Sequence, residues 1–367
     1  MGPAFLWSDG FRAYDFGPTH PLRPQRVERA RTLLRERGLL RPDEEREPAP
    51  AEEADLLLVH EPAYVAAVKA GRPSPEHGLG WGDNPVFPGM HEAASLIAGA
   101  SVAAVRSALE GRAAPVANLA GGLHHALPGR ASGFCIYNDA AVAIAWARKR
   151  YGVRVAYVDI DAHHGDGVQA AFYEEPDVLT VSLHESGRYL FPGTGFPDEI
   201  GRGPGRGYAL NIPLLPGTGD DSFLECLERA LDVVDRFRPD LLVTQCGVDG
   251  HRSDPLAHLA YTTAAYRRAA ALFRSAADAW CDGRWVILGG GGYSWDDAAP
   301  RCWALLWAEA TGRAGTGAAA SAGAVDLADL DDPPAPPTPP EIAAENRRVA
   351  REATRACLQA MAGGRGA

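Results

Sequence analysis

Hydrophobic runs of strand length alternate with amphipathic or small-residue stretches of helical length, from the start of the chain to about residue 312. This alternation is typical of a parallel α/β sheet, because each strand is followed by a crossover segment that covers a face of the sheet. The pattern predicts strands at residues 55–60, 115–119, 153–160, 178–184, 208–213, 241–246 and 285–289.

Between these strands, apolar positions at helical spacing predict the crossover helices. In the first predicted helix, Val27, Ala30 and Leu34 share one face. The full set of predicted helices is 24–37, 91–109, 138–149, 221–237, 262–280 and 298–311.

The composition changes after Gly312, first to Ala and Gly and then to the run DDPPAPPTPP. Such a run is typical of a surface linker rather than of a core. Beyond it, Ile342, Val349 and Leu358 have loose helical spacing. We therefore expect a main domain at 1–312, a linker at 313–340 and a C-terminal helix at 341–367. The acidic run 43–55 is expected to be a solvated connection, or else a surface for a basic partner.

Charge and composition exclude several classes of function. Lys and Arg number 36 and Asp and Glu 47, a formal charge of −11, so the chain repels nucleic acids and anionic membranes. The six cysteines are scattered without a C-x-x-C pair, which favours reduced core residues in a cytoplasmic protein. The longest apolar run, 93–105, has about 13 residues against the roughly 20 of a membrane span, and no signal peptide is expected.

Chemically rich residues follow the predicted strands. The segments, in chain order, are GGLHHA, DIDAHHGDG, FPGTG, GVDG and GGGGYSW. Because the carboxyl ends of parallel strands lie along one edge of a sheet, we expect these segments to converge on one pocket. No Gly-rich stretch has the arrangement of a nucleotide-binding loop, so nucleotide binding is not expected.

The segment DIDAHHGDG predicts a metal site. Period-two geometry places Asp159, Asp161 and His163 on one side of an extended chain, which is unfavourable in a buried strand unless the groups are paired or bind a metal. The alternative is a hydrogen-bonded polar cluster. Asp249, at the end of another predicted strand, would complete a set of two carboxylates and one imidazole with an open position for water, as catalytic metal sites require.

Two further motifs indicate acid–base chemistry. The adjacent His124 and His125 lie on a glycine-framed loop, and neutral imidazole can take and return a proton near pH 7. Asp159 and Asp166 could each orient one of these rings. Tyr293 follows four glycines and could present a phenol to an oxyanion, although a packed aromatic residue in a turn is an open alternative.

The order and spacing of many segments resemble the class I histone deacetylase family, and within it the bacterial acetoin-utilisation deacetylases. The likeness covers roughly residues 10–310. The segments that carry it are HPLRPQRV, GDNPVFPG, GGLHHA, SGFCIYNDAAVAI, YVDIDAHHGDGVQAAFY, TVSLH, FPGTG, CGVDGHRSDPL and GGGGYSW.

The resemblance implies an arginase-like α/β fold with a central, mostly parallel sheet, and hydrolysis of an acetyl amide on a lysine side chain. It implies Zn²⁺ at Asp161, His163 and Asp249. An Asp/Asp/His set with open positions would also accept Fe²⁺. The resemblance makes His125 the general base supported by Asp166. It also makes His124 the partner of His125, supported by Asp159, and Tyr293 the donor to the oxyanion.

Further residues are implied only by this resemblance. Gly133, Phe134, Phe191 and Leu256 would wall an acyl-lysine tunnel, and Asp83 would hold the substrate backbone at its rim. Arg26 would lie beside an exit channel for acetate. Structural K⁺ would bind in two places, one formed by Asp159, Asp161, His163, Ser182 and Leu183 and the other by Phe172, Glu175, Val178 and Tyr208.

Three other functions remain open. An acetylpolyamine amidohydrolase would share the metal and the base but act on small acetylated amines. An arginase-type ureohydrolase needs two Mn²⁺ and further carboxylates that are not evident near DIDAHHGDG. A non-catalytic module could bind acetyl-lysine without hydrolysis. Among protein partners, the resemblance favours acetylated metabolic enzymes, with acetyl-CoA synthetase as the leading candidate.

Overall fold

The computed structural model describes residues 2–111, 114–315 and 325–364. Within them the main sheet has eight parallel strands in the order β2-β1-β3-β8-β7-β4-β5-β6. Its strands are β1 Ala4–Leu6, β2 Glu45–Arg46, β3 Pro115–Asn118, β4 Val155–Asp159, β5 Val178–Glu185, β6 Ala209–Leu214, β7 Leu241–Gln245 and β8 Trp285–Leu288. A separate parallel pair joins β9 Ala314–Gly315 to β10 Val325–Asp326. The predicted α/β fold class is therefore confirmed.

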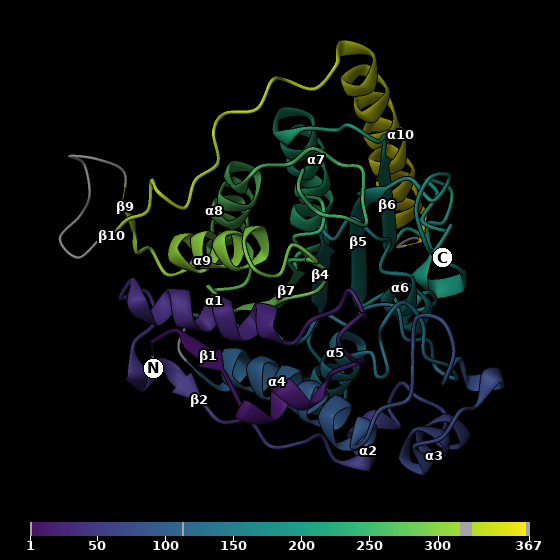
Figure 1. The fold of residues 1–367 in the computed structure, drawn as a ribbon. Coiled ribbons are helices and arrows are strands. Elements are labelled where there is room, and N and C mark those ends of the chain that lie inside the picture. Colours follow the sequence, from purple (N-terminus) through teal and green to yellow (C-terminus); the bar gives the residue numbers. More distant parts are fainter. Residues whose placement is uncertain (1, 112–113, 316–324, 365–367) are drawn as a thin grey trace.

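Helices cover both faces of the sheet, which makes three layers (Figure 1). The helices are α1 Gln25–Glu36, α2 Glu53–Leu56, α3 Pro62–Ala70, α4 Met90–Glu110, α5 Asp139–Tyr151, α6 Asp166–Phe172, α7 Asp220–Phe237, α8 Thr263–Trp280, α9 Ala298–Ala310 and α10 Pro340–Gly364. Short 3-10 turns lie at Asp9–Ala13, Pro42–Glu44, Pro75–His77 and Gly203–Gly205. On one face α4 packs with α5, and on the other α7, α8 and α9 follow one another.

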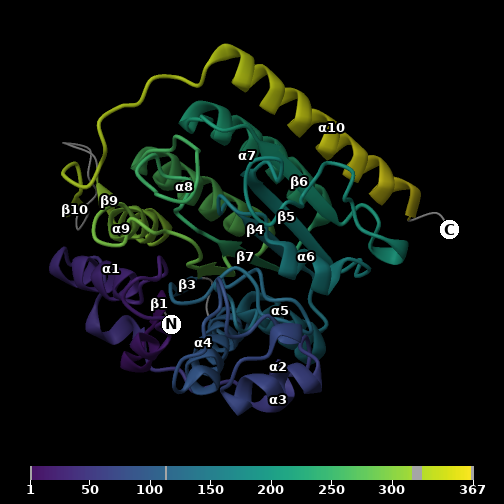
Figure 2. The same ribbon diagram turned by 45° about the vertical axis from the view of Figure 1, so that its right-hand side comes forward.

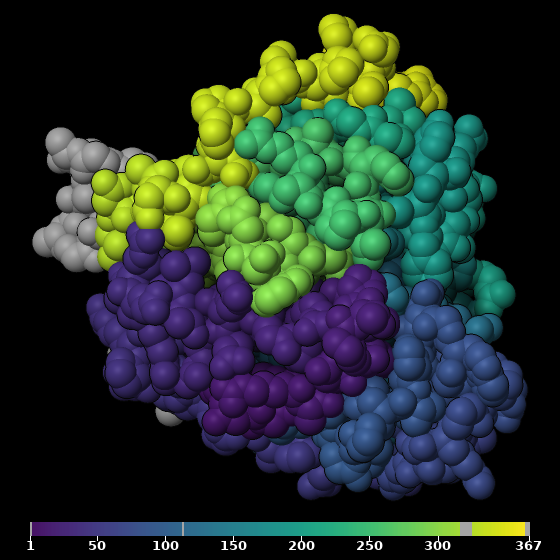
Figure 3. All heavy atoms as spheres, in the orientation of Figure 1, coloured from purple at the N-terminus to yellow at the C-terminus, as the bar shows by residue number. Residues whose placement is uncertain are grey.

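Segments from the two ends of the chain complete the outer layers. Helix α1 packs against α9, and Figure 3 shows the purple N-terminal segment directly against the yellow-green segment that contains α9. Helix α10 lies across α7 and β6 (Figure 2). Its buried side includes Asn346, Ala350, Ala353, Cys357 and Met361.

The sheet is buried on both faces, as a parallel sheet covered by helices must be. All residues of β4, β5, β6, β7 and β8 are buried. The six cysteines are buried and free. Helix α4 is long and apolar enough to cross a membrane by length and composition alone, yet 67% of its most apolar window is buried inside the protein. Such burial is typical of a core helix.

The predicted strand at 55–60 is wrong, because the structure has α2 and a turn there. A short apolar run does not distinguish a buried strand from a helix. Leu56 points into the core whereas Leu57 is 38% exposed, and Pro62 opens the next helix at a position that suits proline. The acidic run 43–55 also differs from a wholly solvated connection, since Glu44 is buried against Arg313.

Candidate active site

The residues singled out from the sequence gather at the carboxyl edge of the four central strands. Strands β3, β8, β7 and β4 are neighbours and run parallel, so the loops that follow them leave the sheet on the same side. The loop after β3 carries His124 and His125, and the loop after β8 carries the four glycines and Tyr293. The loop after β7 carries Asp249, and the loop after β4 carries Asp161 and His163. The convergence expected from the strand ends is therefore observed.

Asp161, His163 and Asp249 form a buried cluster whose ligand atoms all lie within 4.8 Å of one another. His163 Nδ1 is 3.2 Å from Asp161 Oδ1 and 2.8 Å from Asp249 Oδ2. The three groups thus point their nitrogen and oxygen atoms at a common position.

Hydrogen bonds from the surrounding backbone and from a glutamine fix both carboxylates. Asp249 Oδ1 accepts from the Ala162 N–H at 2.7 Å. Asp161 Oδ2 accepts from the Gly291 N–H and from Gln245 Nε2, each at 2.7 Å. One oxygen of each carboxylate is therefore held by protein donors, and the other is directed at His163.

The charges of this cluster fit a divalent cation. Burial and the neighbouring Asp161 raise the pKa of Asp249 to about 7, which reflects two carboxylates confined together. Burial lowers the pKa of His163, but the two carboxylates outweigh it and raise that pKa to about 10. A divalent cation at the common position would replace the proton on His163 and offset the two carboxylates, and a His/Asp/Asp set suits Zn²⁺ or Fe²⁺.

Beside the metal cluster, two histidines are each held by a carboxylate. His124 Nδ1 lies 2.7 Å from Asp159 Oδ2, and His125 Nδ1 lies 2.7 Å from Asp166 Oδ1. The two Nε2 atoms are 3.0 Å apart. Each carboxylate accepts the Nδ1–H of its ring and so directs Nε2 inward.

The two rings differ in charge. Burial lowers the pKa of His124, but Asp159 and Asp161 outweigh it and raise that pKa to about 9. Burial and the neighbouring positive His124 lower the pKa of His125 to about 4 despite Asp166. Near neutral pH, His124 is therefore charged and His125 is neutral, which leaves His125 as the ring that can accept a proton.

The tetraglycine loop brings backbone close to the carboxylates. A β-carbon at Gly291 would come within 2.1 Å of Asp249 Oδ2, and Gly290 and Gly292 have φ values of +113° and +142°. The loop ends at Tyr293, whose N–H donates to Asp254 Oδ2 at 2.7 Å. The Tyr293 ring is 6.4 Å from the His163 ring, between centroids. Burial and nearby carboxylates raise the pKa of Tyr293 well above its usual value, so the phenol stays protonated.

Aromatic side chains surround the approach to these groups. The Phe191 ring is 5.0 Å from the His125 ring, and the Phe134 ring is 5.8 Å from the Tyr293 ring, between centroids. Phe134 has φ +69° and the preceding Gly133 has φ +50°. A β-carbon at Gly133 would come within 2.5 Å of the His125 ring, so a larger residue there would displace the histidine.

The remaining predicted tunnel and rim residues lie on loops around this approach. Asp83 is exposed, and its carbonyl oxygen is 3.2 Å from His20 Nε2. Leu256 follows Asp249 on the same loop, and its N–H donates to Asp254 Oδ1 at 3.0 Å. Asp254 therefore joins the Leu256 loop to the Tyr293 loop.

Arg26 is buried behind the tetraglycine loop. Its Nη1 donates to the Gly292 carbonyl oxygen at 3.3 Å, and its guanidinium lies 5.4 Å from the centre of the Trp303 ring. Burial lowers the pKa of Arg26 although Tyr293 and the metal-site carboxylates act in the opposite direction. The structure thus places this cation on the inner side of the site.

Comparison with known proteins identifies the family. Residues 20–310 match the histone deacetylase domain. The chain belongs to the histone deacetylase family. It is 48% identical over 316 residues to the acetoin utilization protein AcuC of Bacillus subtilis (strain 168). The alignment covers 84% of this chain and 82% of that protein. The AcuC of Staphylococcus aureus (strain MRSA252) is 39% identical over 308 residues, covering 82% and 79%.

Solved structures of the histone deacetylase family share the fold. A histone deacetylase homologue crystallised in complex with SAHA superposes with a TM-score of 0.84 at 33% identity, over 96% of this chain and all of that one. A homologue from Aquifex aeolicus has the same TM-score at 31% identity, with the same coverage. The arginase/deacetylase-like fold expected from the sequence is therefore confirmed, as is the resemblance to the acetoin-utilisation proteins of this family.

The backbone groups predicted to bind K⁺ in this histone deacetylase-family chain lie in two places. Asp159 pairs with Ser182 in the β4–β5 register, and Leu183 follows on β5, close to the segment with Asp161 and His163. In the second place, the Val178 N–H donates to the Glu175 carbonyl oxygen and the Thr180 N–H to the Tyr208 carbonyl oxygen. Phe172 ends α6 just before them. Potassium at either place remains a prediction.

Several supporting residues were not predicted from the sequence. Gln245 ends β7 and donates to Asp161, and Tyr157 donates its hydroxyl to Asp159 Oδ2 at 2.7 Å. Asp139 accepts from the N–H groups of Gly122 and Leu123 and so fixes the start of the histidine loop. The strand-end position of Gln245 was the available signal, whereas Asp139 opens a helix and gave none.

Proposed function

We propose that the protein removes acetyl groups from the Nε atom of lysine in protein substrates, with Zn²⁺ as the first choice of metal and Fe²⁺ as the alternative. The observation that carries this proposal is the buried Asp161/His163/Asp249 cluster beside the neutral His125. Membership of the histone deacetylase family supports it. The products would be acetate and free lysine.

Asp161, His163 and Asp249 would hold the metal through the atoms that now converge. When bound, a divalent cation of this kind polarises a carbonyl group and lowers the pKa of water. The remaining contributions come from side chains of the chain itself.

His125 would take a proton from the attacking water. Its Nδ1 is bonded to Asp166, which fixes the tautomer and makes Nε2, 3.0 Å from His124 Nε2, the atom that accepts a proton. His124 is bonded to Asp159 and carries a charge close to the reacting atoms. One imidazolium of this pair would then supply the proton that the leaving amine needs.

Tyr293 would donate its hydroxyl hydrogen to the oxygen that becomes negative when the amide is attacked. A donor directed at developing charge helps the transition state more than the bound substrate. The high pKa of the phenol supports this role, because an ionised tyrosine could not donate.

The residues predicted from family resemblance complete the proposal. Phe134, Phe191, Gly133 and Leu256 would wall the tunnel, Asp83 would bind substrate backbone at its rim, and Arg26 would line the exit of acetate. K⁺ at the two backbone sites would have a structural role. We also propose that residues 1–312 form the catalytic domain and that the protein works in the cytoplasm on acetylated proteins such as acetyl-CoA synthetase.

The test is acetate release from an acetyl-lysine peptide and, in parallel, from acetylspermidine. The purified protein is assayed as prepared, after chelation, and after Zn²⁺ or Fe²⁺ is restored. We expect release from the peptide that is lost on chelation and recovered with metal. Release from acetylspermidine alone would favour a small-amine amidohydrolase. If the peptide binds but no metal-loaded sample releases acetate, the result would favour the alternative of a non-catalytic binding module.

A further inference from the structure

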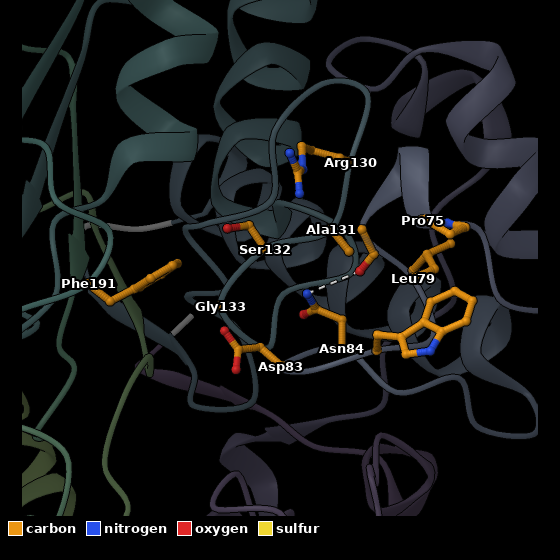
Figure 4. Close-up of a pocket in the computed structure, with 11 residues that line it drawn as sticks. Pro75, Leu79, Asp83, Asn84, Arg130, Ala131, Ser132, Gly133 and Phe191 are labelled. Atoms are coloured by element: carbon orange, nitrogen blue, oxygen red, sulfur yellow. Dashed lines mark hydrogen bonds between the residues drawn. The ribbon is translucent and has the colours of Figure 1, made fainter.

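A cavity of about 400 Å³ opens beside the aromatic residues of the tunnel (Figure 4). We call it the flank pocket. It includes three residues assigned above to the tunnel or its rim, namely Asp83, Gly133 and Phe191. Its other lining residues are Pro75, Gly78, Leu79, Trp81, Asn84, Arg130, Ala131 and Ser132. The flank pocket is therefore continuous with the place where a substrate would enter.

Two loops that bond to each other build this pocket. The Ala131 N–H donates to the His77 carbonyl oxygen at 2.9 Å, and His77 Nδ1 is 2.7 Å from the Gly129 carbonyl oxygen. Within the first loop, Ser74 and Leu79 form an antiparallel bridge. The walls are thus held in place by backbone hydrogen bonds.

Asn84 presents a buried acceptor there that lacks a partner. The residue is only 5% exposed, and its Nδ2 donates to the Gly78 carbonyl oxygen at 3.3 Å. Its Oδ1 has no hydrogen-bond partner among the residues that the structure describes. Figure 4 shows this side chain beside Asp83 and below Ala131. A buried oxygen without a donor is unfavourable, so a ligand N–H would be favoured at this point.

The charges of the flank pocket indicate what it binds. Arg130 is exposed and has no carboxylate within 4.0 Å in the described parts of the chain. Trp81, which is 62% exposed, supplies apolar surface. A peptide segment offers an N–H for Asn84, an apolar stem and a side chain for Arg130. The other charged residue in the lining, Asp83, would attract the cations of a polyamine tail, whereas Arg130 would repel them, so only an acidic side chain would pair with Arg130.

We propose that the flank pocket binds the residue next to the acetylated lysine of a polypeptide substrate and prefers an acidic side chain there. Its backbone N–H meets Asn84 Oδ1, and its carboxylate pairs with Arg130. This inference rests on the proposed function and narrows its substrate to polypeptides with a Glu or Asp beside the acetylated lysine.

The test uses matched acetyl-lysine peptides with Glu, Gln or Lys at each neighbouring position. For one of the two positions, the wild type is expected to hydrolyse the Glu peptide with a kcat/KM about fivefold above that of the Lys peptide, as a partly exposed charge pair allows. Arg130→Glu should reverse this preference. Arg150→Glu makes the same charge change at the exposed end of α5 and should preserve the preference.

A second variant tests the acceptor. Asn84→Leu should lower the ratio of kcat/KM for the Glu peptide to that for acetyl-lysine methylamide, which lacks flanking residues, about three- to tenfold. Asn84→Gln keeps an amide oxygen and an amide donor without adding charge, and should restore part of this ratio. A merely structural role for Asn84 would lower both rates together and leave the ratio unchanged.

Equal kcat/KM for Glu and Lys peptides at both positions, or no reversal in Arg130→Glu, would overturn the inference. Complete absence of turnover with every metal would instead contradict the proposed function. In that case the binding of the same peptides, labelled with a fluorophore, is measured by anisotropy on the Zn²⁺-loaded protein. Tighter binding of the Glu peptide would support the flank pocket, and equal binding would overturn it.

Discussion

Tyr293 and the glycines before it lie against the same small part of the candidate site. Gly291 donates its N–H to Asp161 and leaves no space for a β-carbon next to Asp249. Gly292 accepts from Arg26, and the next residue carries the phenol. The backbone of Gly291 and Gly292 therefore holds Asp161 and Arg26 just before Tyr293, and the close approach at Gly291 explains why no side chain is present there.

Replacing Tyr293 with Phe is expected to lower kcat about 10²- to 10³-fold, because one donor to the developing oxyanion is lost. Bound metal, measured by elemental analysis, should not change, since the tyrosine is not among the three converging ligands. Tyr189→Phe, at a 56% exposed position, is the matched control and should retain full activity. A fully active Tyr293→Phe would refute the oxyanion role.

At this scale the sequence was most informative about residues at strand ends. Asp161, His163 and Asp249 could be grouped from their positions in the chain alone, because parallel strands deliver their ends to one edge. Asp254 and Asp139 could not be assigned in this way, because their role is to accept hydrogen bonds from backbone N–H groups of distant loops. Such contacts depend on how loops close in three dimensions, and no spacing in the chain reveals them.

Among the elements, the turn before β2 is tied to the segment between α9 and β9 by a buried ion pair. Glu44 is 5% exposed, and Arg313 Nη1 donates to its Oε2 at 2.8 Å. Arg313 also donates to the Leu39 carbonyl oxygen. Arg313→Met should lower the free energy of unfolding by about 3 kcal/mol at pH 7, because it leaves a buried carboxylate without its partner. Urea unfolding measures this loss.

The ion pair between Glu44 and Arg313 also makes the stability lost in Arg313→Met depend on pH. Burial raises the pKa of Glu44, but Arg313 outweighs it and leaves the pKa below the usual value. A lowered pKa stabilises the fold above the unfolded-state value near 4.3, and that contribution disappears as the pH falls through the folded-state pKa. The difference between wild type and Arg313→Met should therefore shrink below about pH 4. A difference that is constant from pH 7 to pH 3 would contradict this explanation.

Helix α10 is attached by a buried amide. Asn346 Oδ1 accepts from the Leu215 N–H at 3.1 Å, and its Nδ2 donates to the hydroxyls of Thr218 and Ser222. Asn346→Leu should cost about 2 kcal/mol of unfolding free energy, since buried partners lose their bonds. Gln359→Ala, on the exposed side of the same helix, should change it by less than about 0.5 kcal/mol. Equal effects would mean that α10 is not held through Asn346.

Elements with strong periodicity were predictable and short ones were not. Strands β4, β5, β6, β7 and β8 fall within one or two residues of their predicted bounds. β1 and β2 have three and two residues, too few to show any period. They are strands because β1 pairs with the edge of β3 and β2 pairs with β1. Segment 55–60 had the composition of a strand, but it forms the end of α2 and a turn, and α2 packs against α5, so tertiary context decided its structure.

For the whole molecule, the metal cluster should link cation binding to folding. Its ligands come from the loops after β4 and β7, which meet only in the folded chain. Zn²⁺ at 100 times its dissociation constant should raise the free energy of unfolding by about 2.7 kcal/mol. Asp249→Asn keeps an oxygen for the Ala162 N–H but loses the negative charge, so it should show much less stabilisation. Equal stabilisation of both proteins would place the bound ion elsewhere.

The strand order also has a consequence for synthesis on the ribosome. β3 and β4 are separated in the sheet by β8 and β7, which the ribosome makes last among the eight strands. The 129 residues between Asp159 and Leu288 take roughly 6 to 26 s to translate at 5 to 20 residues per second. During that time the nascent chain carries two unpaired strand edges, which attract other strands and chaperones. The centre of the sheet is completed only when β8 has been made, and the Asp161/His163/Asp249 cluster only after β7, so both depend on strands made late in the sheet.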